Sequence, residues 1–120
     1  MKTLSLDEIN DLDLHDHPCE RIDIDFGSKK IRMIYANYDE TNKDYIYHEL
    51  VFNGVAMLRI SDIEVDDFNY SPDIFEQDAI AFDHETFEIK LIMGVWQPIT
   101  EIEFRFKQCQ LNETPLYPTP

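Results

Sequence analysis

Three residues that often bind metal ions alternate along one short segment of the chain, namely His15, His17 and Cys19. On an extended backbone alternate side chains share a face, so all three could contact one zinc ion. A fourth ligand could come from His48, His84 or Cys109. Structural zinc sites more often have paired Cys-x-x-Cys or His-x-x-x-His spacings. We therefore expect His15 and His17 to bond to backbone groups and the protein to hold no cofactor, with the zinc site as the alternative.

Paired carboxylates are a second possible source of chemistry. A glycosidase-type site needs two carboxyl groups in one cleft, whereas strand alternation would place Asp23 and Asp25 together on a solvated face. Cys19 is followed by Glu20, whose charge would raise the thiol pKa and make a poor nucleophile. Phosphate-binding loops are rich in glycine, and the chain has only three glycines, so such a loop is not expected. We predict that the protein is not an enzyme.

The charge of the chain restricts its partners more than any motif does. It has 25 Asp and Glu against 10 Lys and Arg, a net charge of -15 on 120 residues. Such a field repels nucleic acid and anionic membrane surfaces. It attracts basic proteins and accelerates their encounter. We therefore predict a basic protein partner, with no nucleic-acid or membrane partner.

The first element that the sequence predicts is a short helix over Leu6–Leu12. Ser5 and Glu8 have the spacing of a capping box, in which each side chain satisfies a backbone N–H at the start of a helix. Pro18 then prevents the helix from continuing and favours an extended chain before it.

After Pro18 the pattern changes to the period of two that is typical of strands. Ile22, Ile24 and Phe26, for example, alternate with charged residues and should face inward. Gly27–Lys29 should form a turn, and Asn53-Gly54 is a strong signal for a two-residue hairpin. The predicted strands are Arg21–Phe26, Lys30–Tyr38, Tyr45–Asn53, Val55–Ile63, Ala79–Phe82, Thr86–Met93 and Ile99–Leu111. The predicted core includes Ile24, Phe52, Leu58, Leu91 and Phe104.

These elements predict a mainly β protein, bordering on α+β, that forms one domain over residues 1–120. The fold class we expect is an antiparallel β-sandwich or half-open barrel of six to seven short strands with one short N-terminal helix. Residues 1–13 would hold the helix, residues 14–111 the β core, and residues 112–120 a loose proline-rich tail.

The segment Glu64–Ala79 is rich in acids and has helix and strand breakers, so we expect a loop with one helical turn from Pro72. Aromatic residues beside acids are what a surface for a basic partner would contain. The predicted partner-binding residues are Asp62, Asp66, Asp67, Phe68, Tyr70, Asp73 and Glu76. Other tyrosines could contribute to such a surface, although each is more simply read as a half-buried strand residue; they are Tyr35, Tyr38, Tyr45 and Tyr47.

The cysteine count and the absence of apolar segments bear on the compartment. Cys19 and Cys109 are too few for a disulfide framework, so we expect reduced thiols in a cytoplasmic protein, with a single disulfide as the alternative. The N-terminal residues are acidic where a signal peptide would be apolar. No stretch approaches the ~20 apolar residues of a membrane span.

Three segments follow one another along the chain, namely Leu14-His15-Asp16-His17, the strand Glu20–Phe26 and Leu50–Val55. In this order they resemble a loose group of small acidic bacterial proteins that includes immunity proteins of toxin–immunity systems, and the resemblance covers about residues 12–110. It implies a non-catalytic immunity protein that binds and neutralises a cognate basic toxin. The alternatives are a β-domain that binds another protein or a small ligand, and a metal-binding domain or enzyme that uses His15, His17 and Cys19.

Overall fold

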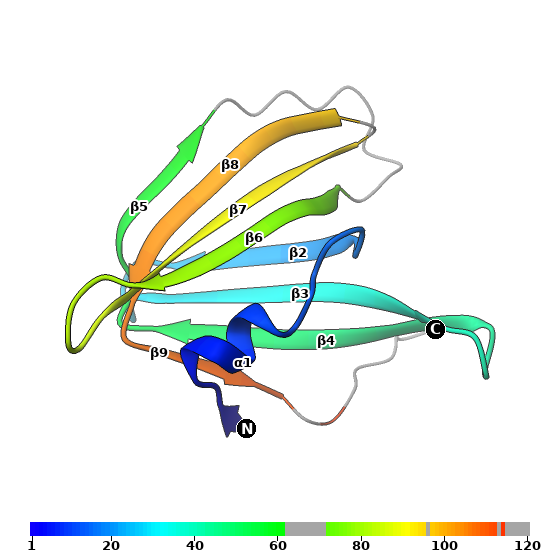
Figure 1. The fold of residues 1–120 in the computed structure, drawn as a ribbon, viewed down its shortest axis with the longest axis horizontal. Helices are drawn as coiled ribbons and strands as arrows, with labels where there is room; N and C mark the ends of the chain where they lie inside the picture. The colour runs from blue at the N-terminus through cyan, green and yellow to red at the C-terminus, as the bar shows by residue number, and fades with distance from the viewer. Residues whose placement is uncertain (62–71, 96, 113, 115–120) are drawn as a thin grey trace.

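The computed structural model describes residues 1–61, 72–95, 97–112 and 114, and of residues 95 and 97–99 it describes only the backbone. Within these residues the chain forms two antiparallel sheets and one short helix (Figure 1). The sheets face each other as a sandwich and do not close into a barrel. The predicted fold class is therefore confirmed.

The larger sheet has five strands in the order β1-β9-β4-β3-β2, and the smaller has four in the order β5-β8-β7-β6. We call them the five-stranded sheet and the four-stranded sheet. The strands of the first are β1 Lys2–Thr3, β2 Cys19–Asp25, β3 Lys30–Asp39, β4 Asp44–Asn53 and β9 Gln108–Leu111. Those of the second are β5 Ala56–Ser61, β6 Asp73–Ala81, β7 Phe87–Val95 and β8 Gln97–Phe106.

The two sheets are joined by a corner at which two paired strands bend together. β4 continues into β5 through Gly54, and β8 continues into β9 through Lys107, whose N–H donates to the carbonyl oxygen of Asn53 at 2.9 Å. The predicted hairpin at Asn53-Gly54 is therefore wrong, because β4 and β5 belong to different sheets. The single strand predicted over Ile99–Leu111 is divided between the sheets for the same reason.

A second correction concerns the segment after Pro72, for which we expected a loop with a helical turn. It forms the strand β6 (Asp73–Ala81), which pairs with β7 along its length and buries Ile74 and Ala79. Pairing with a neighbouring strand thus outweighs the polar local sequence. The rest of the predicted acidic loop, over residues 62–71, lies outside the described residues.

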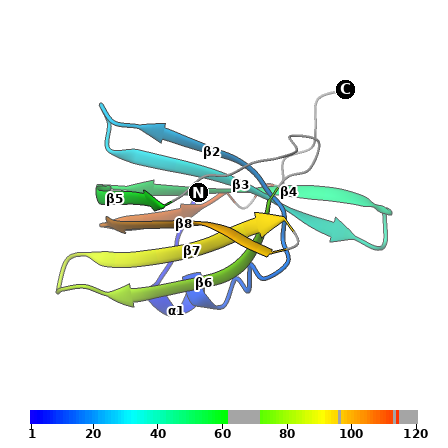
Figure 2. The same ribbon diagram turned by 90° about the horizontal axis from the view of Figure 1, so that it is seen from above.

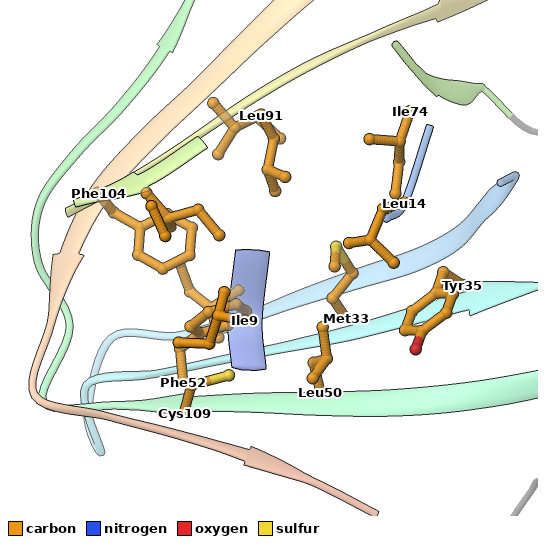
Figure 3. Close-up of a cluster of buried hydrophobic side chains, with 14 of the residues drawn as sticks. Ile9, Leu14, Met33, Tyr35, Leu50, Phe52, Ile74, Leu91, Phe104 and Cys109 are labelled. Atoms are coloured by element: carbon orange, nitrogen blue, oxygen red, sulfur yellow. The ribbon is translucent and has the colours of Figure 1, made fainter. Parts of the chain in front are cut away.

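The core fills the space between the two sheets (Figure 3). Its centre is aromatic, since the ring centroid of Phe52 lies 5.0 Å from those of Phe104 and Phe106 in edge-on contacts. Of the predicted core residues, Phe52, Leu91 and Phe104 are buried, and Ile24 and Leu58 are half-buried at the margin.

Phe26 is an exception to the predicted inward face of its strand. Its residue surface is 80% exposed, whereas Ile22 and Ile24 pack against the core. The reason is that β2 ends at Asp25 and the chain turns before Phe26. The turn itself is as predicted, with the Asp25 carboxylate accepting hydrogen bonds from the N–H groups of Gly27 and Ser28.

The N-terminal helix α1 (Leu6–Asn10) covers one edge of the four-stranded sheet. The predicted capping box is present, because Ser5 and Glu8 each accept the backbone N–H of the other. The Asn10 side chain both donates to and accepts from the backbone of Ala79 in β6. The helix thereby satisfies part of a strand edge that would otherwise be open. It is also too short to cross a membrane, and no other helix occurs in the described residues.

We predict that Phe104→Ala lowers the free energy of unfolding by about 3–5 kcal/mol, because a fully buried aromatic ring leaves a cavity. Chemical denaturation of the two proteins measures the difference. Ile80→Ala is a suitable control, since Ile80 is 50% exposed and should change stability by less than about 0.5 kcal/mol. Equal effects of the two substitutions would contradict the placement of the core.

We also predict that Gly54→Ala destabilises the protein by about 1–2 kcal/mol, because the left-handed backbone is costly for any residue with a Cβ. Gly54 has a φ of +68°, and an added Cβ would lie 2.9 Å from Cγ of Lys107. An added Cβ would also lie 3.0 Å from Cβ of Lys107, so repeating the substitution in a Lys107→Gly background, measured against Lys107→Gly alone, removes the crowding but keeps the backbone strain. Most of the loss should therefore persist in the double variant, and full recovery would show that crowding alone is responsible.

Candidate functional site

The structure describes only two of the seven predicted partner-binding residues. Asp73 begins β6 and is half-buried, and burial followed by the charge of Asp16 raises the pKa of its carboxyl group. Glu76 is exposed on the same strand. The other five lie outside the described residues; they are Asp62, Asp66, Asp67, Phe68 and Tyr70. That surface therefore stays a prediction.

The three residues of the alternative metal site are occupied with other contacts. Nδ1 of His15 donates to the carbonyl oxygen of Phe75 at 2.7 Å, and Nδ1 of His17 donates to that of Ala36 at 3.1 Å. These are the backbone bonds that we expected. Cys19 is buried and faces the core. Within the part of the chain that the structure describes, no three His, Cys, Asp or Glu side chains gather as a metal-binding group.

Both cysteines are free and buried in the core, which agrees with the expected reduced thiols. Burial raises the pKa of each thiol to about 12. A thiol with so high a pKa is almost entirely protonated at neutral pH, and the protonated form is a poor nucleophile. The arrangement gives neither Cys19 nor Cys109 the means for covalent catalysis.

Tyrosines gather on the outer face of the five-stranded sheet, along the β3–β4 hairpin. Tyr38 lies opposite Tyr45 in the register of the two strands, and their rings meet edge-on with centroids 5.4 Å apart. The two residues are 50% and 43% exposed. Further along the hairpin Ala36 lies opposite Tyr47. We call the outward surface formed by Ile34, Tyr38, Tyr45 and Tyr47 the tyrosine face; Ala36 is buried beneath it.

Strand alternation explains why only some of the tyrosines reach this surface. Tyr35 is on the inner face of β3 and only 6% exposed, whereas Tyr38 is three positions further on and points the other way. Tyr47 is half-buried, as expected for a strand tyrosine. Sequence reasoning named these tyrosines but did not separate the exposed ones from the buried one. The signal that could have separated them is the odd spacing between Tyr35 and Tyr38.

Acidic residues lie at one end of the tyrosine face. Asp39 ends β3, Asp44 begins β4, and the turn between them holds Glu40 together with Lys43. The pKa of the Tyr47 hydroxyl is raised by partial burial, and then by the negative charges of Glu20 and Asp44. Figures 1 and 2 show that the β3–β4 hairpin extends beyond the end of the four-stranded sheet.

An ion-pair network borders the tyrosine face toward the middle of the sheet. Arg21 and Arg32 both pair with Asp23, at 2.8 Å and 3.5 Å, and Arg32 also pairs with Glu49. Glu49 is only 8% exposed. The two arginines and two carboxylates balance one another, so this region is electrically neutral and holds the outer side chains of three strands in place.

The outer face of the four-stranded sheet is different in kind. Its charged side chains pair across strands, with Glu88 and Arg105 at 3.3 Å and Lys90 and Glu101 at 3.4 Å. Arg105 also lies over the ring of Phe82, 3.6 Å from its centroid. Carboxylates still outnumber basic side chains on these strands, by six to three, so the tyrosine face differs from this face mainly in its exposed pair of tyrosine rings.

Comparisons with known protein families, with characterised proteins and with solved structures find no match to this chain.

The inner side of the same hairpin carries a cluster of three rings. Tyr35 stacks on His48 with centroids 5.1 Å apart and meets His17 edge-on at 6.0 Å. Burial, followed by the proximity of His17, lowers the pKa of His48. Protonation of His48 therefore opposes the packing that supports the tyrosine face from behind.

We predict that this cluster makes stability depend on pH. The unfolded chain, with an ordinary His pKa near 6.5, binds a proton more readily than folded His48. The contribution of His48 is therefore complete above pH ~6.5 and is lost as the pH falls through the lower folded pKa. Urea unfolding at pH 5.5 and pH 7.5 should show a smaller loss on acidification in His48→Phe, which keeps a ring against Tyr35 but takes no proton.

His15 also makes stability depend on pH, because its bond to the carbonyl oxygen of Phe75 and the charge of Asp16 raise its pKa. Its contribution has the opposite sign, since it is present below the unfolded pKa and lost as the pH rises through the folded one. Both proteins keep His15, so the difference between them reports His48. If acidification from pH 7.5 to pH 5.5 lowers the free energy of unfolding equally in the two proteins, the prediction is contradicted.

Proposed function

We propose that this protein is a non-catalytic binding protein that holds a basic protein partner against the tyrosine face. The observation that carries the proposal is the exposed Tyr38–Tyr45 pair on the outer face of the sheet, with acids at its edge. Aromatic anchors inside a ring of polar groups are the usual composition of an interface hot spot. The partner that fits has Lys and Arg around an apolar or cationic centre.

We further propose that the partner is a basic toxin and that the protein acts in the cytoplasm as its immunity protein. The net charge of -15 supports this, because it would direct a basic toxin toward the inhibitor. The resemblance to small acidic immunity proteins is a second argument for it, although acidity is part of that resemblance. Inhibition would come from covering the active site or substrate groove of the toxin, which needs no catalytic group on this chain.

The two parts of the surface should have different energetic roles. Tyr38 and Tyr45 can lose most of their exposed area to a partner, so they should determine how slowly the complex dissociates. Glu40 and Asp44 lie at the rim, where charges mainly affect the association rate. The acidic segment that begins at Asp62 remains a predicted extension of the surface, on sequence grounds alone.

The test is to co-purify the protein with the basic product of a neighbouring gene and to measure both rate constants across a salt series. We predict that Tyr38→Ala or Tyr45→Ala speeds dissociation and weakens binding about thirtyfold, which corresponds to ~2 kcal/mol for a buried anchor. Ile80→Ala is the matched control, because Ile80 is equally exposed on the other sheet. It should leave both rates unchanged.

The charges are tested by a second matched pair of variants. Glu40→Gln with Asp44→Asn should slow association several-fold at low salt, with an effect that fades as the Debye length falls from about 10 Å at 0.1 M to about 3 Å at 1 M. Asp78→Asn with Glu85→Gln changes the net charge equally, but on the four-stranded sheet and the loop after it. Equal slowing by both pairs, or no effect of the tyrosine variants, would mean that the partner binds another surface.

A further inference from the structure

A pocket of about 280 Å³ lies at the end of the molecule opposite the tyrosine face. It is formed by the turn between β2 and β3 together with the start of β5 at the corner. The N–H of Val55 donates to the carbonyl oxygen of Lys29 at 2.9 Å and ties these two segments together. Its lining residues are Ile24, Asp25, Phe26, Lys29, Lys30, Val55, Ala56, Met57 and Leu58.

The walls of this pocket are apolar and unusually exposed. Ile24, Val55 and Leu58 form its inner part, where they pack against the core. Phe26 and Met57 stand at its opening and are 80% and 59% exposed. Large apolar side chains grouped at such exposure are typical of a binding site, since folding alone does not account for them.

The backbone of Met57 also departs from its strand. It has a φ of +55°, in the left-handed region, and it lies where the pairing of β5 with β8 is interrupted by a bulge. Unbranched residues adopt this conformation only at a cost of about 1–2 kcal/mol. The bulge turns the Met57 side chain to the pocket, which is a known use of bulges beside functional sites.

The pocket occupies the open side of the sandwich. β2 and β5 are the terminal strands of their sheets on this side, and both contribute residues to the pocket. On the other side α1 covers the edge of β6 through Asn10 and Gln77. Among the described residues no helix covers the margin of the core between β2 and β5, whereas α1 covers the corresponding edge at β6.

The charge at the pocket is opposite to that of the protein as a whole. Six of the ten basic side chains pair with carboxylates; they are Lys2, Arg21, Arg32, Arg59, Lys90 and Arg105. Lys29 and Lys30, which line the pocket, form no ion pair with any described residue. The carboxylate of Asp25 also lines the pocket, directly opposite Lys30 in the strand register. Bonds to Ser28 and Gly27, followed by the charge of Lys30, lower the pKa of Asp25, so the pocket has two ammonium groups and one carboxylate.

We infer that this pocket binds a small amphipathic carboxylate of the medium-chain fatty acid class. The apolar chain would lie along Phe26, Met57 and Leu58, and the carboxylate would meet the ammonium groups of Lys29 and Lys30. A volume of 280 Å³ leaves room for an acyl chain of this length, since one water needs only about 10–15 Å³ of such space. The inference is independent of the proposed protein partner, whose surface lies at the other end of the molecule.

Titration of the purified protein with octanoate, followed by heteronuclear NMR and calorimetry, tests this inference. We predict saturable binding with a dissociation constant below about 1 mM, and with chemical-shift changes confined to residues 24–30 and 55–58. Octan-1-ol and octylammonium have the same chain without the carboxylate. The alcohol should bind more weakly, and the ammonium weakest of all.

Single substitutions distinguish the two halves of the site. Lys29→Gln and Lys30→Gln should each weaken octanoate about five- to tenfold and leave octan-1-ol unaffected. Lys43→Gln removes the same charge at the other end of the molecule and should change neither. Met57→Asn should weaken both ligands without lowering the unfolding midpoint, because Asn tolerates the left-handed backbone. No saturable binding of octanoate, or equal binding of octanoate and octylammonium, would overturn the inference.

Discussion

The corner at Gly54 and Lys107 is the constraint on which the rest of the structure depends. Two antiparallel strands reach it from one sheet and leave it as part of the other, still side by side. Gly54 allows the left-handed turn, and the bond from Lys107 to Asn53 keeps the two chains in register through it. Because the bend brings one face of each sheet inward, Phe52, Phe104 and Phe106 can meet at the centre of the core.

The same bend determines what each end of the molecule can do. At the corner the sheets converge, and the turn between β2 and β3 packs against the start of β5 to form a small apolar pocket with two lysines. At the far end the β3–β4 hairpin runs past the four-stranded sheet and presents its outer tyrosines among acids. The two candidate sites therefore differ in shape and charge, and each suits a ligand that the other would exclude.

Charge is distributed to match this division. Most of the basic side chains are held in ion pairs on the sheet surfaces, so they contribute little to recognition beyond their strands. The excess of acids dominates the field at a distance, while the lysines at the corner act only locally because salt screens them. A protein of strongly negative charge can thus carry a confined site for an anion.

The sequence by itself determined the features that depend on near neighbours. The capping box of α1, the turn at Asp25–Lys29 and the alternation of Ile31, Met33 and Tyr35 follow from local bonds and from the pleat of a strand, so they were predictable. The same alternation was enough to predict the sandwich class and most of the core. The same alternation implies that Tyr35 and Tyr38 point to opposite faces of β3, and this is why one is buried and the other exposed.

Only the tertiary structure decided which strands pair and which apolar residues remain outside. The alternation of apolar and polar residues shows which face of a strand is buried, but it does not show which strand lies beside it. From the sequence β5 therefore looked like the partner of β4, whereas in the structure it pairs with β8. For the same reason β6 looked like an acidic loop until its pairing with β7 supplied bonds for its backbone. Phe26 and Met57 have the composition of core residues, and they are exposed because the strand end and the bulge place them at the open side of the sandwich. Such positions depend on contacts between residues far apart in the chain, and local sequence does not encode those contacts one by one.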